Sequence, residues 1–125
     1  MSGTPTHRRR YRDAALGTPT TMTLQSMGTD QLEEARISTS GRASRTLHSG
    51  ARLRQTLIAL IAGTRMNEHQ SPGDATVHCL RGHVTLHTRE RTVTVAEGVL
   101  ADVPPERHDL VADQDSVLIL TVAVV

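Results

Sequence analysis

The stretches Gly63-Thr-Arg-Met-Asn-Glu-His69 and Gly98-Val-Leu-Ala-Asp-Val-Pro-Pro-Glu-Arg-His108 carry the pattern that decides the fold. Each opens on a glycine and ends on a histidine, and the first is followed by Gly82. Between them, apolar and polar residues alternate on both sides of Arg89-Glu-Arg91, which is typical of a β-hairpin. The block therefore predicts short strands joined by tight turns, with a histidine closing each of the two segments.

Strand patterns flank this block on both sides. Residues 53–62 begin by alternating and then become continuously apolar, and Gly63 ends the run too early for a comfortable helix. Residues 116–125 are apolar almost throughout. Short strands at roughly ten-residue spacing, with almost no helix, indicate an all-β fold that closes into a small antiparallel barrel of the jelly-roll kind.

Both flanking runs, residues 53–62 and 116–125, are apolar on two faces. One face of each strand can line a barrel, and the other needs separate cover, because large exposed apolar patches are rare on monomers. A second subunit would supply that cover. The pattern therefore predicts a homodimer.

Three segments divide the chain. Residues 1–28 are rich in Thr, Gly, Pro and Arg and are expected to form a disordered basic tail. Residues 29–45 are expected to hold a short helix, capped by Thr29 or Asp30 and ending near Arg36, and then a small polar linker. Residues 46–125 are expected to form the barrel domain.

Composition limits the classes of partner. The 125 residues carry 14 Lys plus Arg against 13 Asp plus Glu, so neither nucleic acid nor a membrane is indicated as a partner. The sequence contains no Phe or Trp, the residues on which single-stranded nucleic acids usually stack. Cys79 is the only cysteine, which excludes an intramolecular disulfide. Arg8–Arg10 are not followed by the apolar segment of a secretory signal, and a cytoplasmic protein is expected.

The two histidine segments resemble the two sequence motifs of the cupin family, and most of all those of small single-domain bacterial cupins of the RmlC-like superfamily. Glycine, proline and histidine positions of both motifs match, namely Gly63, His69 and Gly82 in the first and Gly98, Pro104 and His108 in the second. The second motif is one residue shorter than usual before its histidine. The resemblance covers residues 46–125 and implies a cupin β-barrel with a pocket at its mouth.

The same resemblance implies a metal site that is incomplete. Such a barrel usually holds a divalent transition metal, for which Fe, Zn, Ni or Cu suits imidazole ligands. His69 and His108 keep two ligand positions, whereas Ser71 and Ala75 stand where a second histidine and a glutamate are usual. Two histidines alone normally make a weak site. A metal-free pocket, in which both imidazoles hydrogen-bond to water or backbone, is therefore the alternative.

Three further residues are candidates for the binding pocket. Arg107, beside His108, and Arg65, on the strand leading to His69, could each grip a carboxylate or phosphate in bidentate fashion. The alternative for both is a plain surface arginine. Cys79 is expected on an inward strand face, where a buried thiol that acts as a small hydrophobe is the simplest interpretation.

Three functions fit these residues, and the sequence leaves open whether the protein is an enzyme. The first is a cupin that binds a small molecule, with or without a divalent metal, and has no catalysis of its own. The second is a metal-dependent oxygenase or isomerase of a small molecule that works through His69 and His108. The third is an interaction module whose basic residues Arg8–Arg10 touch an acidic partner. The missing ligand positions favour the first.

Overall fold

The computed structural model of the protein describes residues 21–69 and 73–124, with the side chains of residues 67–69 outside that description. Arg8–Arg10 lie outside the described residues. No helix in the described part of the chain is long and apolar enough to cross a membrane. The elements in chain order are α2 (Leu24–Ile37), β1 (Arg42–Ser49), β2 (Leu53–Leu60), β3 (Arg65–His69), β4 (Ala75–Arg81), β5 (His83–His87), β6 (Thr92–Ala96), β7 (Leu100–Asp102), β8 (His108–Ala112) and β9 (Ser116–Ala123).

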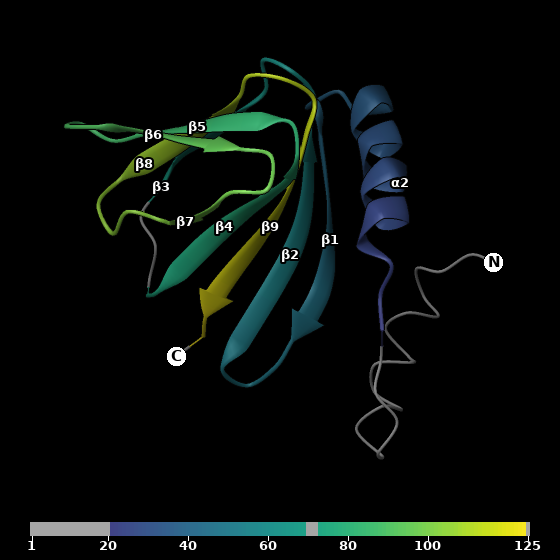
Figure 1. The fold of residues 1–125 in the computed structure, drawn as a ribbon, viewed down its shortest axis with the longest axis horizontal. Helices are drawn as coiled ribbons and strands as arrows, with labels where there is room; N and C mark the ends of the chain where they lie inside the picture. The colour runs from purple at the N-terminus through teal and green to yellow at the C-terminus, as the bar shows by residue number, and fades with distance from the viewer. Residues whose placement is uncertain (1–20, 70–72, 125) are drawn as a thin grey trace.

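The strands form two antiparallel sheets that face each other (Figure 1). The five-stranded sheet has the order β1-β2-β9-β4-β7, and the four-stranded sheet has the order β3-β8-β5-β6. Alternate side chains of each strand point between the sheets, as the two-residue period of a strand requires. The prediction of an all-β antiparallel barrel with a short helix is confirmed.

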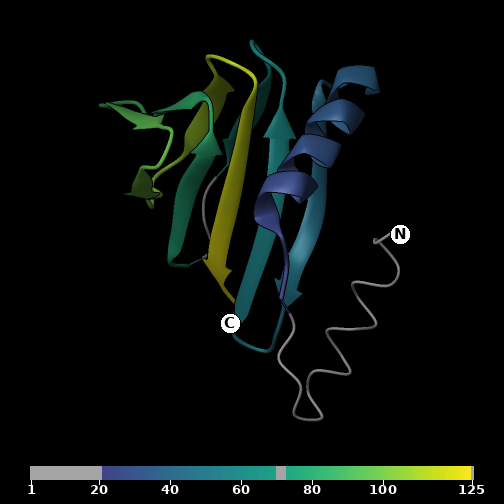
Figure 2. The same cartoon turned by 45° about the vertical axis from the view of Figure 1, so that its right-hand side comes forward.

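The strands β2 and β9 bury both of their faces, which explains their continuous apolar sequence. Ile58 and Leu118 are paired across these strands and point between the sheets. Their neighbours Leu57 and Ile119, also paired, point the other way and pack under α2. Three layers result: the helix, the five-stranded sheet and the four-stranded sheet (Figure 2).

The helix α2 supplies the cover that the sequence analysis assigned to a second subunit. Met27, Leu32 and Ala35 of α2 are buried against the outer face of β1, β2 and β9. Gly28 brings the helix close to the sheet, because a Cβ at this position would lie 3.1 Å from Cγ1 of Val117. The apolar outer faces of β2 and β9 therefore give no support to a homodimer.

Two expected boundaries at the N-terminal side are wrong. The helix begins at Leu24 instead of Thr29 or Asp30, so residues 24–28 are not part of a disordered tail. Burial of Met27 against the sheet extends the helix where composition alone favoured disorder. The expected linker ends early because β1 begins at Arg42, where main-chain pairing with β2 decides the structure of small polar residues.

A tight turn at Gly82 closes one end of the barrel. Gly82 has a φ of +89°, and a Cβ there would lie 2.3 Å from the carbonyl oxygen of Asp115, so only glycine fits. The hydroxyl of Ser116 accepts a hydrogen bond from the backbone N–H of His83 (3.0 Å) and donates to the carbonyl of Gln114 (2.8 Å). The positive φ and the lack of room for a Cβ give a physical reason for the glycine that closes the first sequence motif.

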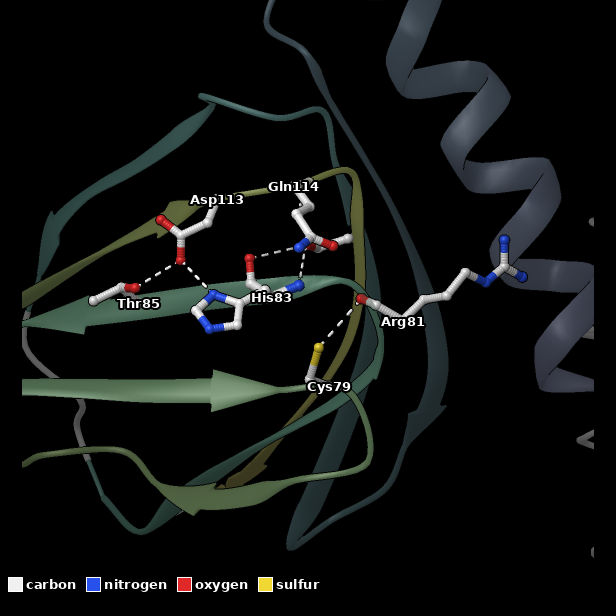
Figure 3. A network of polar contacts seen from close by, with 7 residues as sticks. Cys79, Arg81, His83, Thr85, Asp113 and Gln114 are labelled. Carbon is white, nitrogen blue, oxygen red and sulfur yellow. Dashed lines mark hydrogen bonds and ion pairs between the residues drawn. The ribbon is translucent and has the colours of Figure 1, made fainter.

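A side-chain network lies beside this turn (Figure 3). One carboxylate oxygen of Asp113 contacts Nδ1 of His83 and accepts from the hydroxyl of Thr85, both at 2.7 Å. The Thr85 hydrogen bond, followed by the His83 hydrogen bond, lowers the pKa of Asp113. The network ties the start of β5 to the loop between β8 and β9.

Candidate ligand-binding cavity

The interior of the barrel is solid at the end near Gly82. Leu60, Val84, Val95 and Ala112 are completely buried there, as is Cys79. These small and medium side chains meet from both sheets and leave the turn side closed. We call this region the closed end.

The opposite end of the barrel is hollow. A cavity of about 230 Å³ lies where β3 and β9 end and β4 and β8 begin. In the part of the chain that the structure describes, nine aliphatic side chains and one imidazole form its wall, namely Ile58, Met66, Val77, Leu86, Val103, His108, Leu110, Leu118, Leu120 and Val122. We call this region the open end.

Among the described residues, His108 is the only polar side chain in this wall. It is the first residue of β8, it follows the turn that begins at the buried Pro104, and it is 2% exposed. Its Nδ1 lies 2.9 Å from the carbonyl oxygen of Glu106. Because a carbonyl oxygen can only accept, Nδ1 carries a hydrogen. The turn therefore fixes the position of this imidazole and places a hydrogen on its Nδ1.

The backbone of His69 lies opposite His108. The two residues are Cα partners in the antiparallel pair of β3 with β8, after an irregularity between Met66 and His69. The side chain of His69 and the whole of Ser71 fall outside the described residues. The fold thus brings together, at the backbone level, the two histidines that the sequence analysis singled out.

Arg65 does not line the cavity. It precedes Met66, which does, so strand alternation turns Arg65 to the outer face of the four-stranded sheet. Its guanidinium forms an ion pair with the carboxylate of Asp109 and is about half exposed. One carboxylate oxygen of Asp109, Oδ1, is buried and has no hydrogen-bond partner among the described residues.

Arg107 lies in a different recess. That recess is lined by four charged residues, Arg89, Glu90, Glu106 and Arg107, at the tip of the β5–β6 hairpin. The pKa of Glu106 is lowered, first by a hydrogen bond from its own backbone N–H and then by the nearby Arg91. His108 points into the barrel while its neighbour Arg107 is exposed, as alternation along an extended chain requires.

Cys79 belongs to the closed end and not to the cavity wall. Its thiol donates to the carbonyl oxygen of Arg81 at 3.2 Å, as Figure 3 shows. Burial raises the pKa of the thiol above its ordinary value. The group therefore stays protonated at neutral pH and acts as a small apolar side chain.

The aliphatic residues that form the wall were not identifiable one by one from the sequence. They come from β2, β3, β4, β5, β8 and β9, and the loop after β7, and each is an ordinary core residue by type. The signal available was alternation: Leu118, Leu120 and Val122 share one face of β9. Which part of that face is filled and which is hollow depends on the opposite sheet, so it could not be read from one strand.

The comparisons with known proteins agree on the fold. The sequence matches no protein-family model and no curated protein. A conserved protein of unknown function from Streptococcus pyogenes, SPY1581, is 32% identical, with a TM-score of 0.62 over 69% of this chain and 76% of that one. A cupin superfamily protein from Desulfitobacterium hafniense is 15% identical, with a TM-score of 0.63 over 67% and 78% of the two chains. An RmlC-like cupin from Shewanella frigidimarina is 19% identical, with a TM-score of 0.61 over 70% and 78%.

This chain has the cupin fold. The likeness confirms the cupin β-barrel that the resemblance to the two cupin motifs implies. The structure adds the physical role of two motif positions. Gly82 makes the turn at the closed end, and His108 places an imidazole in the cavity wall.

The described residues of this chain do not fit a transition-metal centre by themselves. Among them, no group of three or more His, Cys, Asp or Glu side chains is placed to hold a metal ion. Ala75 is buried at the position where a cupin glutamate is usual, and its methyl group offers no ligand. His108 thus contributes one nitrogen to a wall that is otherwise aliphatic, whereas structural and catalytic zinc sites use three or four protein ligands.

Proposed function

We propose that this cupin is a binding protein that holds a small, mainly aliphatic molecule in the cavity at its open end, without catalysis of its own. The observation that carries the proposal is the composition of the wall, with nine aliphatic side chains and one imidazole. Transfer of apolar surface into such a wall contributes roughly 25 cal/mol for each Å² removed from water. The cavity therefore favours an apolar ligand body over a polar one.

The imidazole of His108, the one polar group of the described wall, limits the chemistry that this wall supports. A carboxylate or ammonium group wholly inside the wall would lose its hydration and meet no opposite charge, which disfavours a fully buried ionic ligand. General acid–base catalysis usually needs at least two positioned groups, and the described wall supplies only His108. A binding role agrees better with this wall than an acid–base mechanism does.

The proposal is tested by closing the cavity with one side chain. Leu120→Phe places a larger ring in the wall, and Leu53→Phe makes the same change on β2 at a 40% exposed position outside the wall. We expect 1-octanol to bind the wild type and Leu53→Phe alike, and Leu120→Phe at least ~10-fold more weakly, which corresponds to about 1.4 kcal/mol. Isothermal titration calorimetry measures all three. Equal binding to the two variants, or no binding to the wild type, would contradict the proposal.

A metal-dependent oxygenase or isomerase is the second candidate. Its support is the Cα pairing of His69 with His108, and the hydrogen bond from Nδ1 of His108 to a backbone carbonyl, which is how metal-binding imidazoles are commonly oriented. Elemental mass spectrometry on untagged protein purified without chelator tests it. Near-stoichiometric Fe, Zn, Ni or Cu that is lost in His69→Ala/His108→Ala, and kept in His78→Ala/His87→Ala, would replace the binding-protein proposal with this one.

A homodimer is also proposed, on a different surface from the one first considered. Val99 and Leu100 are 40% and 64% exposed beside β7, the edge strand of the five-stranded sheet. A second copy covering them would remove this apolar surface from water. Light scattering that shows a monomer at micromolar concentration would exclude the dimer at that concentration.

A further inference from the structure

Arg54 stands at the rim of the cavity by strand register. It pairs directly with Val122, a residue of the cavity wall, across β2 and β9. Directly opposed residues in an antiparallel pair share a face, so Arg54 belongs to the barrel side of β2 together with Ile58, another wall residue. Unlike Ile58, Arg54 is exposed. A cation thus ends the aliphatic wall where the wall meets solvent.

The charge of Arg54 is not used inside the described protein. Arg36, Arg65 and Arg91 each form an ion pair with an acidic side chain. Arg54 makes no ion pair and no side-chain hydrogen bond with the part of the chain that the structure describes. A guanidinium presents a planar fork of N–H donors that matches a carboxylate. The guanidinium of Arg54 is therefore available to bind an anionic group of a ligand.

Two exposed acidic residues of the described chain also belong to this end of the sheet. The carbonyl oxygen of Asp74 accepts a hydrogen bond from the N–H of Ala123, which places Asp74 near the end of β9, and Asp102 pairs with Thr76 on β4. Neither carboxylate makes an ion pair with Arg54. Arg52, just before β2, adds a second exposed positive charge two residues from Arg54. An anionic head group beside Arg54 would thus have Arg54 and Arg52 as its cationic neighbours on β2 and the turn before it.

Cavity and rim together describe one kind of ligand. Val122 lies four positions after Leu118 along β9, a span of roughly 13 Å at the rise of a β-strand, and Arg54 lies at the Val122 end. An apolar chain along this wall would leave its end group beside Arg54, where a charge keeps its contact with water. Resting on the proposed function, we infer that this cupin binds an aliphatic carboxylate of medium chain length, with the chain in the cavity and the carboxylate on Arg54.

Three probes that share one chain and differ in the head group test the inference: octanoate, 1-octanol and octylamine. Titration calorimetry compares the wild type with Arg54→Gln and with Arg42→Gln. Arg42 is the matched control, since it is an exposed arginine of the same sheet that pairs with Leu60 at the closed end. We expect the wild type and Arg42→Gln to bind octanoate at least ~10-fold more tightly than 1-octanol, and octylamine most weakly.

The variant Arg54→Gln distinguishes a specific role of Arg54 from a general effect of positive charge. We expect it to lose the preference for octanoate and to bind 1-octanol as the wild type does, while Arg54→Lys regains part of the preference. Equal loss in Arg42→Gln and Arg54→Gln would mean a general charge effect and would overturn the role of Arg54. Binding of 1-octanol without any preference for octanoate would overturn this inference and leave the proposed function intact. Failure of all three probes to bind the wild type would overturn both.

Discussion

The two apolar layers of this barrel are built from opposite faces of the same strands, but one is filled and the other contains a cavity. On one side of β2 and β9, Leu57 and Ile119 meet the helix α2 in a filled layer. On the other side, Ile58 and Leu118 face a cavity at the open end. The residue types are the same, so the difference comes from what stands opposite. A helix packs continuously along its length, whereas two sheets that splay apart at one end leave a space between them.

Each layer also contains a buried polar side chain, and the two differ in whether their hydrogen-bond donors are satisfied. His108, 2% exposed, has its Nδ1 hydrogen satisfied by a backbone carbonyl at the cavity wall. Gln31 of α2 is 1% exposed in the filled layer, and its Nε2 has no hydrogen-bond partner among the described residues. A satisfied polar group beside a cavity agrees with binding, whereas an unsatisfied one in a filled layer costs stability.

The largest expected effect comes from leucine truncation on the two sides of the sheet. Leu57→Ala removes a completely buried side chain from the filled layer, and we expect it to lower the free energy of unfolding by about 3 kcal/mol. Leu120 is partly exposed and already borders a cavity, so Leu120→Ala only enlarges an existing space. We expect it to lower the free energy of unfolding by about 1 kcal/mol. Urea unfolding monitored by circular dichroism measures both. Equal losses would show that the cavity side is as tightly packed as the helix side.

A smaller effect of the opposite sign is expected at Gln31. Gln31→Leu replaces an unsatisfied buried amide with an apolar side chain of similar size, so we expect the free energy of unfolding to rise by about 1 kcal/mol. Gln25→Leu, on the exposed part of α2, is the control and should leave it nearly unchanged. If Gln31→Leu destabilises the protein instead, the amide of Gln31 has a partner, such as a buried water, that the filled layer accommodates.

The smallest expected effect concerns the closed end in acid. The pKa of Asp113 is lower in the folded protein than its ordinary value of 3.8, so its contribution to stability is present above pH ~4 and is lost as pH falls through the lowered pKa. Because Asp113 is 40% exposed, we expect this contribution to be under ~1 kcal/mol. Thermal unfolding between pH 2 and pH 6 should show a weaker pH dependence in Asp113→Asn than in the wild type. An unchanged pH dependence would mean that other carboxylates dominate acid unfolding.

Much of the barrel could be predicted from the sequence because its signals are local. Gly82 requires a positive φ, residues 83–87 alternate with period two, and Pro104 interrupts a strand before His108. The predicted start of the N-terminal helix was wrong because it depends on contacts with strands that are distant in sequence. Gly28 and Met27 look like tail residues until Val117 and the rest of the sheet are placed beneath them.

In the candidate site, too, some residues could be identified from the sequence and others only from the tertiary structure. The resemblance to the cupin motifs singled out His108 and His69, and the structure pairs their backbones across β3 and β8. Arg65 and Arg107 were candidates only because they adjoin motif residues in sequence, and strand alternation turns them away from the cavity. Arg54 carries no local sign of a role, because its relation to the cavity passes through Val122, which is far from it along the chain.

By itself, the sequence determined the all-β class and the turns, because backbone conformation and strand period depend on residues close together in the chain. Its resemblance to the cupin motifs singled out the histidine of the cavity wall. Only the tertiary structure decided what covers the second apolar face of β2 and β9, where the barrel is hollow, and which cation stands at its rim. Those features depend on which surfaces meet. An apolar strand face has the same sequence whether a helix, another subunit or an empty space lies against it.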